Sequence, residues 1–164
     1  MIGLVTLLFG SLVYVVDRPP SETYFIYSSS ISISLYDSFP NIFKFIGNSL
    51  PSFIHVFSFI LITAGLLHCQ KRGYLLICAC WFLIDIIFEL GQKFNSFFST
   101  IVPNWFSDIL FLENCKAYFL LGTYDFNDLA AIAFGSFLAY FILSITIKRR
   151  PLWKRQKYPG AKNF

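Results

Sequence analysis

The stretch Tyr74–Lys93, YLLICACWFLIDIIFELGQK, decides the fold because it is long and apolar enough to enter a bilayer yet acidic along one face. At helical spacing its polar residues Asp85, Glu89 and Gln92 form a single stripe. An Asp at the centre of a membrane helix costs about 2.5–3.5 kcal/mol, whereas each Leu, Ile or Phe contributes only about 0.3–0.6 kcal/mol in return. We therefore expect the stripe to lie near one membrane surface or to face other helices.

The composition of the whole chain is that of a membrane protein. Of its 164 residues, 56% are hydrophobic and only 13% are charged, and the mean hydropathy is +0.63. A chain of this length is expected to form one domain. The sequence predicts an all-α fold with four transmembrane helices, at residues 1–16, 52–70, 74–92 and 125–147, followed by a basic tail at 148–164.

The first predicted span, residues 1–16, is shorter than the roughly 20 residues that usually cross a bilayer. A secretory signal peptide is the alternative interpretation. However, no basic residue precedes the apolar run, and the segment VYVVD that ends it offers no small-residue cleavage site. We expect the segment to be retained as the first helix.

Shorter elements are expected in the two long connections. The alternation of apolar and polar residues at 31–35 indicates a short strand or an extended segment. Residues 42–46 suit a short amphipathic helix on the membrane surface, ended by Gly47, with Pro51 then beginning the second span. In the second connection, which is rich in aromatic residues, a further interfacial helix is expected around 104–112.

Basic residues predict the orientation of the helices. Nine of the thirteen Lys and Arg residues lie in the tail or at Lys71 and Arg72, between the second and third spans. Because the cytoplasmic side of a membrane protein carries the excess of basic residues, both termini are expected in the cytoplasm. A basic tail beside a membrane helix suits contact with anionic lipid. We therefore expect the lipid bilayer as a partner and do not expect nucleic acid.

In this topology, polar residues from three spans reach the same depth near the outer surface. These candidate ligand-binding residues are His55, Asp85, Glu89, Gln92, Asp125 and Asp128. Simpler roles remain open for several of them. Glu89 has Lys93 four residues further along the helix, Asp125 and Asp128 have the spacing of a helix cap, and His55 suits a helix end.

Carboxylates with an imidazole can bind a divalent cation, hold a cationic headgroup, relay protons, or act as general acid and base. No recognisable hydrolase motif or phosphate-binding glycine loop supports catalysis. Cys78 and Cys80, two residues apart, fall on different helix faces, and the four cysteines do not form a disulfide framework. The sequence predicts neither a metal site nor a cofactor.

Three segments resemble the VanZ-like integral membrane proteins. They are PSFIHVFSF at 51–59, with His55 and Phe59; FELGQ at 88–92, with Glu89 and Gln92; and GTYDFNDLAAIAFG at 122–135, with Asp125, Asp128 and Gly135. The chain departs from that family's pattern at three places, where the family usually has an Asp-Lys pair, an Arg and an Asn: Pro51–Ser52, Thr123 and Ile132.

The resemblance implies a protein of the bacterial inner membrane that acts in the cell envelope, with a link to susceptibility to glycopeptides of the teicoplanin type. We expect the polar cluster to bind a lipid headgroup or a lipid-linked envelope precursor. One alternative is an intramembrane hydrolase or transferase acting on such a lipid, with Glu89 or Asp128 as the base and His55 as its partner. A second is a small proton-coupled transporter in which Asp85 titrates.

Overall fold

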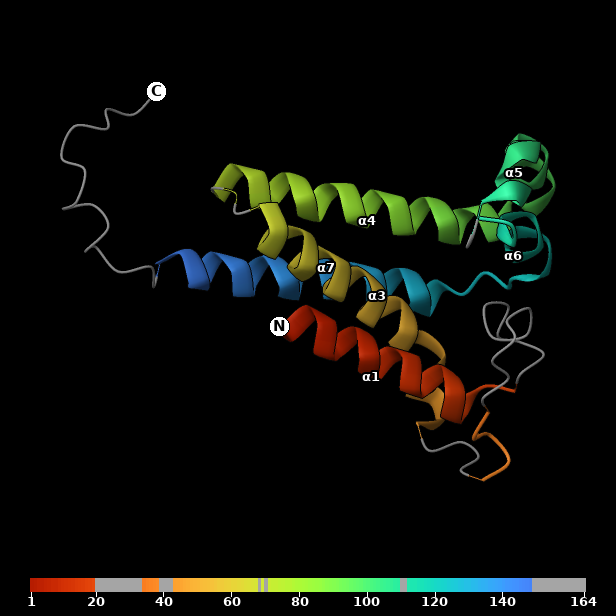
Figure 1. The fold of residues 1–164 in the computed structure, drawn as a ribbon, viewed down its shortest axis with the longest axis horizontal. Helices are drawn as coiled ribbons and strands as arrows, with labels where there is room; N and C mark the ends of the chain where they lie inside the picture. The colour runs from red at the N-terminus through yellow and green to blue at the C-terminus, as the bar shows by residue number, and fades with distance from the viewer. Residues whose placement is uncertain (20–33, 39–42, 68, 70, 110–111, 149–164) are drawn as a thin grey trace.

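The structure, a computed structural model, describes residues 1–19, 34–38, 43–67, 69, 71–109 and 112–148. All regular secondary structure in these ranges is helical, as the sequence predicts (Figure 1). The elements are α1 (Ile2–Asp17), α3 (Lys44–Leu67), α4 (Lys71–Lys93), α5 (Asn95–Ile101), the 3₁₀ helix η2 (Asn104–Asp108), α6 (Cys115–Leu121) and α7 (Phe126–Lys148).

Three of these helices, α3, α4 and α7, are long and apolar enough to cross a membrane. Helix α1 is also apolar, but it has only 16 residues. At 1.5 Å per residue it is about 24 Å long, less than the roughly 30 Å of a bilayer's hydrocarbon core. By length and composition, the described part of the chain therefore has three candidate membrane spans and one shorter apolar helix, as is typical of a membrane protein.

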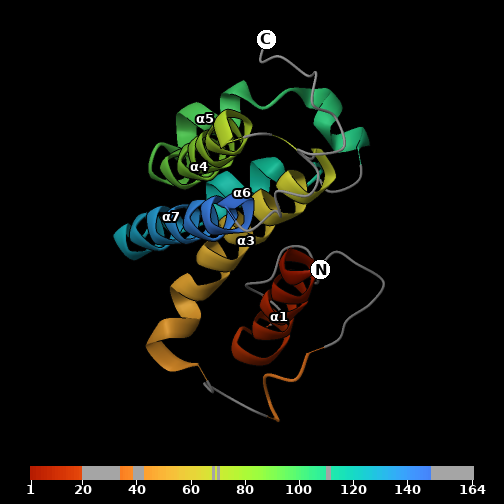
Figure 2. The same cartoon turned by 90° about the vertical axis from the view of Figure 1, so that its left-hand side faces the viewer.

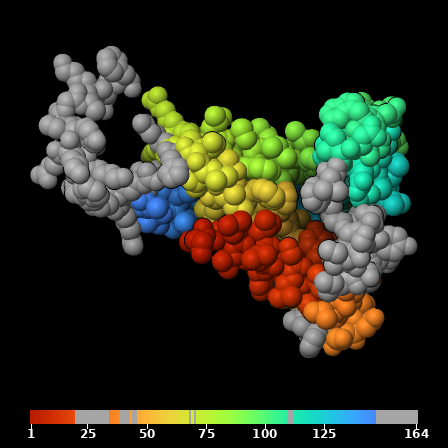
Figure 3. Space-filling model, viewed as in Figure 1, coloured from red at the N-terminus to blue at the C-terminus, as the bar shows by residue number. Residues whose placement is uncertain are grey.

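The four long helices run roughly along one common direction (Figure 1). The beginnings of α1 and α4 and the ends of α3 and α7 lie toward one end of the bundle, whereas α5 and α6 lie at the other. Helix α3 packs against α1, α4 and α7. Viewed along the bundle, α1 and α4 lie well apart, with α3 passing between them (Figure 2). The space-filling view shows α1 along one edge of the molecule (Figure 3).

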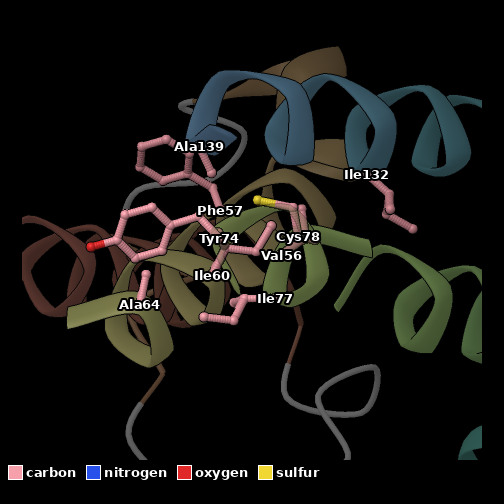
Figure 4. Close-up of a cluster of buried hydrophobic side chains, with 9 residues drawn as sticks. All are labelled: Val56, Phe57, Ile60, Ala64, Tyr74, Ile77, Cys78, Ile132 and Ala139. Atoms are coloured by element: carbon pink, nitrogen blue, oxygen red, sulfur yellow. The ribbon is translucent and has the colours of Figure 1, made fainter. Parts of the chain in front are cut away.

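A cluster of buried side chains joins α3, α4 and α7 (Figure 4). Its members are Val56, Phe57, Ile60, Ala64, Tyr74, Ile77, Cys78, Ile132 and Ala139. Many other large apolar side chains of these helices are exposed, among them Leu76 at 65% and Phe137 at 66%. An exterior this apolar is expected of a surface that faces lipid rather than water.

Glycines allow the helix backbones to approach closely. A Cβ atom on Gly3 of α1 would lie 2.9 Å from the Ser58 carbonyl oxygen of α3, and one on Gly10 would lie 2.6 Å from Ile54 Cγ2. On the other side of α3, a Cβ on Gly135 of α7 would lie 2.7 Å from a methyl carbon of Val56. Small residues at these contacts are characteristic of helix packing in membranes.

The region before the second span differs from the prediction. Gly47 does not end a separate surface helix, and Pro51 does not begin the span. Both lie inside one continuous helix, α3, that begins at Lys44. Polar contacts from the end of α1 hold this early part: the Phe43 N–H donates to Asp17 Oδ1 at 3.1 Å, and Arg18 Nη2 donates to the Asn48 carbonyl at 2.9 Å. Inside a helix a proline removes one backbone hydrogen bond and its ring crowds the carbonyl four residues earlier, which is Gly47 here, yet α3 continues through Pro51.

Other expectations for the connections are met only in part. The helix expected at 104–112 is the shorter 3₁₀ helix η2, which ends at Asp108. The extended segment predicted at 31–35 and the tail at 148–164 fall mostly outside the described residues. Short helices do lie between α4 and α7, and their position at a membrane surface stays a prediction.

Replacing Gly135 by Ala is expected to destabilise the bundle by about 1–3 kcal/mol, because the added methyl group overlaps Val56 and the Phe53 carbonyl oxygen, 2.9 Å away. Gly65 is the matched control, since nothing lies within 4 Å of a Cβ at that position. Gly65→Ala should leave stability unchanged or raise it by up to about 1 kcal/mol. Thermal unfolding of the detergent-solubilised variants measures both; equal midpoints would contradict this account of the packing.

Candidate ligand-binding site

A cavity of about 450 Å³ lies between α1 and α4, with α3 along its floor. Its walls come from α1, α3 and α4, with Ile132 of α7 and residues of α6 and the segment before it. Apolar side chains make up much of the lining, including Leu7, Ile54, Ile84 and Ile132. The volume falls within the roughly 300–1,000 Å³ typical of small-molecule sites.

Two of the predicted site residues meet in this cavity across α3 and α4. The Nδ1 atom of His55 lies 3.1 Å from Oδ2 of Asp85. The Asp85 side chain is 8% exposed and that of His55 is 50% exposed. The buried carboxylate therefore has a hydrogen-bond partner, and the imidazole is oriented by it while remaining accessible from the cavity.

The continuous α3 places this pair at matching depths. His55 lies about 16 Å from the beginning of α3 at Lys44, and Asp85 lies about 12 Å before the end of α4 at Lys93. The sequence interpretation put His55 within one turn of the helix end. The two additional turns of α3 set it deeper, level with Asp85 rather than with the residues at the ends of α4 and α7.

Glu89 also lines the cavity, and it connects α4 to the beginning of α7. It is 4% exposed, and its Oε1 accepts a hydrogen bond from the Asp125 backbone N–H at 2.9 Å. The suggested pairing of Glu89 with Lys93 does not occur. The Lys93 Nζ instead lies over the Tyr124 ring, 4.9 Å from its centroid.

Asp125 immediately precedes α7 and Asp128 lies in the first turn of that helix; neither lines the cavity. Asp125 caps the helix: its Oδ1 accepts from the Asn127 backbone N–H at 2.9 Å, as the capping interpretation predicted. Asp128 lies near the side chains of Ser49 and Ser52 of α3. Its buried Oδ1 has no hydrogen-bond partner within the described ranges.

Gln92 does not line the cavity either. It lies beside Tyr118 of α6 and packs against Gly122, where a Cβ atom would lie 2.8 Å from its amide carbon. The six candidates thus separate into two groups: three cavity residues, His55, Asp85 and Glu89, and three residues that fix the end of the bundle, Gln92, Asp125 and Asp128.

Several cavity residues were not predicted from the sequence. Tyr14 and Ser11 enter from α1, and Trp81 from α4. Tyr118 enters from α6, and its burial, together with the nearby Glu89 carboxylate, raises the pKa of its phenol above the usual value. The phenol therefore stays a neutral hydrogen-bond donor at physiological pH. The one sequence signal for these residues is the spacing of Ser11 and Tyr14, which lie three residues apart and therefore on one face of a largely apolar helix.

The aromatic side chains form an ordered wall. Phe59 stacks on Trp81 with ring centroids 4.7 Å apart, and His55 lies 4.5 Å from Phe59. The Trp81 indole N–H donates to Thr63 Oγ1 at 3.0 Å, which fixes the plane of the ring. The cavity therefore joins two acidic side chains and one imidazole to a rigid aromatic surface, which suits binding of a group that is partly polar and partly apolar.

No group of three or more His, Cys, Asp or Glu side chains in the described part of the chain is arranged to hold a metal ion. The sequence matches no family model. No curated protein and no solved structure is significantly similar to it.

Two variants of Glu89 distinguish the contribution of its charge to stability from the contribution of its hydrogen bond. Glu89→Gln keeps an oxygen that accepts from the Asp125 N–H and should cost less than about 1 kcal/mol of stability. Glu89→Leu leaves that N–H without its partner and should cost about 1–3 kcal/mol. Unfolding of the purified variants in denaturing detergent measures the difference. Equal losses for the two variants would show that the hydrogen bond to α7 does not stabilise the fold.

Proposed function

We propose that the protein is a four-span membrane protein whose cavity binds an amphiphilic lipid of the bacterial envelope. The observation that supports this most directly is the composition of the cavity, in which His55, Asp85 and Glu89 lie on walls otherwise built largely of apolar and aromatic side chains. A lipid headgroup would meet the polar residues, and part of its chain would contact the apolar ones. The resemblance to VanZ-like proteins supports the same envelope setting and a link to glycopeptide susceptibility.

The location of the cavity favours a ligand that arrives through the membrane. The cavity is not enclosed, and it separates α1 from α4, two helices whose outer faces are strongly apolar. Leu8 on α1 is 72% exposed, and Leu83 on α4 is 55% exposed. A molecule that is itself dissolved in lipid reaches such a site without leaving the bilayer.

In the proposed orientation, α5, η2 and α6 face the outside of the cell and the turn between α3 and α4 faces the cytoplasm. The positive-inside rule supports this assignment, because Lys71 and Arg72 follow that turn at the beginning of α4 and the basic tail follows α7. Both termini then lie in the cytoplasm, and the predicted interfacial helices lie in the outer leaflet.

Single cysteines test this orientation in a chain whose four native cysteines are replaced by Ala or Ser. A cysteine at Ser107, exposed in η2, should react with a membrane-impermeant maleimide on intact cells. A cysteine at Arg72, exposed at the beginning of α4, should react only after the cells are lysed. The reverse labelling pattern would overturn the proposed topology.

Blocking the cavity tests ligand binding without changing its charge. Ser11 lines the cavity from α1, so Ser11→Trp would fill part of the volume that we assign to the ligand. Mass spectrometry of lipids that co-purify in mild detergent should show several-fold less lipid per protein for this variant than for the wild type.

Leu8→Trp is the matched control, because Leu8 lies on the same helix, is 72% exposed and is not a cavity residue. It adds the same indole to the outer face of α1, so it should leave the retained lipid unchanged. Equal retention by the wild type and Ser11→Trp, with normal thermal stability, would contradict binding in the cavity.

A second candidate, an intramembrane hydrolase or transferase, is favoured by one observation. Asp85 holds the Nδ1 of His55, the arrangement that orients a histidine for general-base catalysis. The pairing differs from the one expected from sequence, in which Glu89 or Asp128 was the base. In this candidate His55 takes a proton from water or a hydroxyl group that attacks the lipid. The same lipid extracts discriminate: a cleaved lipid in the wild type and an intact one in His55→Ala would indicate an enzyme.

A further inference from the structure

The charge of the cavity lining is one-sided. Two acidic residues, Asp85 and Glu89, line it, and no Lys or Arg is among the lining residues that the structure describes. Both carboxyls are nearly buried, at 7% and 4% exposure for the whole residues. An anionic headgroup would disfavour the ionised form of both carboxyls, whereas a cationic one would favour it and pair with the resulting charge.

The described basic residues near this end of the bundle contact other groups. Arg18 donates to the Asn48 carbonyl and lies 5.0 Å from the Tyr14 ring centroid. Lys93 lies over the Tyr124 ring. Lys116 Nζ donates to Asn104 Oδ1 at 2.9 Å. None of the three is a cavity residue, so none is placed to neutralise a phosphate bound beside the carboxylates.

Besides the two carboxylates, the cavity lining contains aromatic rings, which also bind ammonium groups. Five aromatic residues besides His55 line the cavity: Tyr14, Phe59, Trp81, Phe88 and Tyr118. Ammonium groups bind over aromatic faces, best over tryptophan, and more strongly where water is excluded. The indole of Trp81 is already fixed by its hydrogen bond to Thr63, so binding does not have to order it.

The volume of the cavity indicates a ligand larger than an ammonium group alone. The cavity of about 450 Å³ is much larger than one headgroup nitrogen with its methyl groups, and its lining includes the aliphatic residues Leu7, Ile54, Ile84 and Ile132. A water molecule's share of liquid volume is only about 30 Å³. The remaining space is therefore suited to an attached hydrocarbon chain.

We propose that the cavity binds the ammonium group of an amphiphile, which is held between the carboxylates of Asp85 and Glu89 and the rings of Phe59 and Trp81. This deepens the proposed function and rests on it, because it names the chemistry of the headgroup. The ammonium group can belong to an aminophospholipid of the membrane or to a single-chain alkylammonium compound that enters from outside. The two sources share the chemistry, and the experiment separates them.

Trp81 itself can report binding. Replacing Trp105 and Trp153 by Phe leaves Trp81 as the only tryptophan of the three in the chain. The protein is then purified in dodecyl maltoside, which is neutral and carries no amine. Dodecyltrimethylammonium, dodecylamine and dodecyl sulfate are titrated in parallel, so that the chain length is constant and only the headgroup charge changes. Saturable changes in Trp81 fluorescence are expected with the two cationic compounds at concentrations about tenfold below any change with dodecyl sulfate.

Charge-removing variants test the role of the carboxylates. In Asp85→Asn and Glu89→Gln the remaining oxygen still accepts the hydrogen bond that each carboxylate accepts from His55 or from the Asp125 N–H, so folding should be preserved. Both variants together should raise the half-saturation concentration of dodecyltrimethylammonium by about tenfold or more. Asp108→Asn is the matched control, because Asp108 is exposed in η2 and is not a cavity residue.

Native mass spectrometry of the same proteins, incubated with phosphatidylethanolamine or phosphatidylglycerol, identifies the source. Selective retention of phosphatidylethanolamine assigns the site to a membrane aminolipid, and binding of the alkylammonium compounds alone assigns it to a single-chain compound. Tighter binding of dodecyl sulfate, or no effect of the carboxylate variants, would overturn the ammonium assignment while leaving amphiphile binding intact. If no amphiphile of either charge binds, the proposed function fails as well.

Discussion

A carboxylate buried in an apolar helix bundle requires a hydrogen-bond donor, and α4 carries two such carboxylates. Each obtains its donor from a different neighbour: Asp85 from the imidazole of His55 on α3, and Glu89 from the backbone N–H of Asp125 at the beginning of α7. The polar stripe of α4 thereby connects this helix to both α3 and α7. Both carboxylates lie in the cavity wall, so the need to give each of them a donor also determines which part of the cavity is polar.

Much of the helical framework could be predicted because its signals are local. Long apolar runs marked α3, α4 and α7, and the spacing of Asp85, Glu89 and Gln92 placed them on one face. The path through Pro51 could not be predicted, since it depends on contacts from Asp17 and Arg18 that lie far away in sequence. The local rule that proline favours a helix beginning gave the wrong boundary there.

The candidate site was predictable as a set of residues but not as a geometry. Depth along the helices brought six polar residues to one end of the bundle, yet depth alone does not say which helix faces which. In the structure His55, Asp85 and Glu89 line the cavity, whereas Gln92, Asp125 and Asp128 lie outside its lining. The aromatic wall escaped prediction for the same reason: aromatic residues are abundant in the sequence, and only packing selects Phe59 and Trp81.

The length of α1 has a consequence for the lipid around it. In the proposed four-span arrangement α1, about 24 Å long, is shorter than hydrocarbon about 30 Å thick, and local thinning of the bilayer is one way to accommodate the mismatch, at fractions of a kcal/mol per Å. Such thinning would be confined to the side of the molecule where α1 borders the cavity, because α3, α4 and α7 are each longer. Headgroups on that side would then sit closer to the mid-plane than elsewhere, and this hydrophobic mismatch would bring them toward the level of Asp85 and His55.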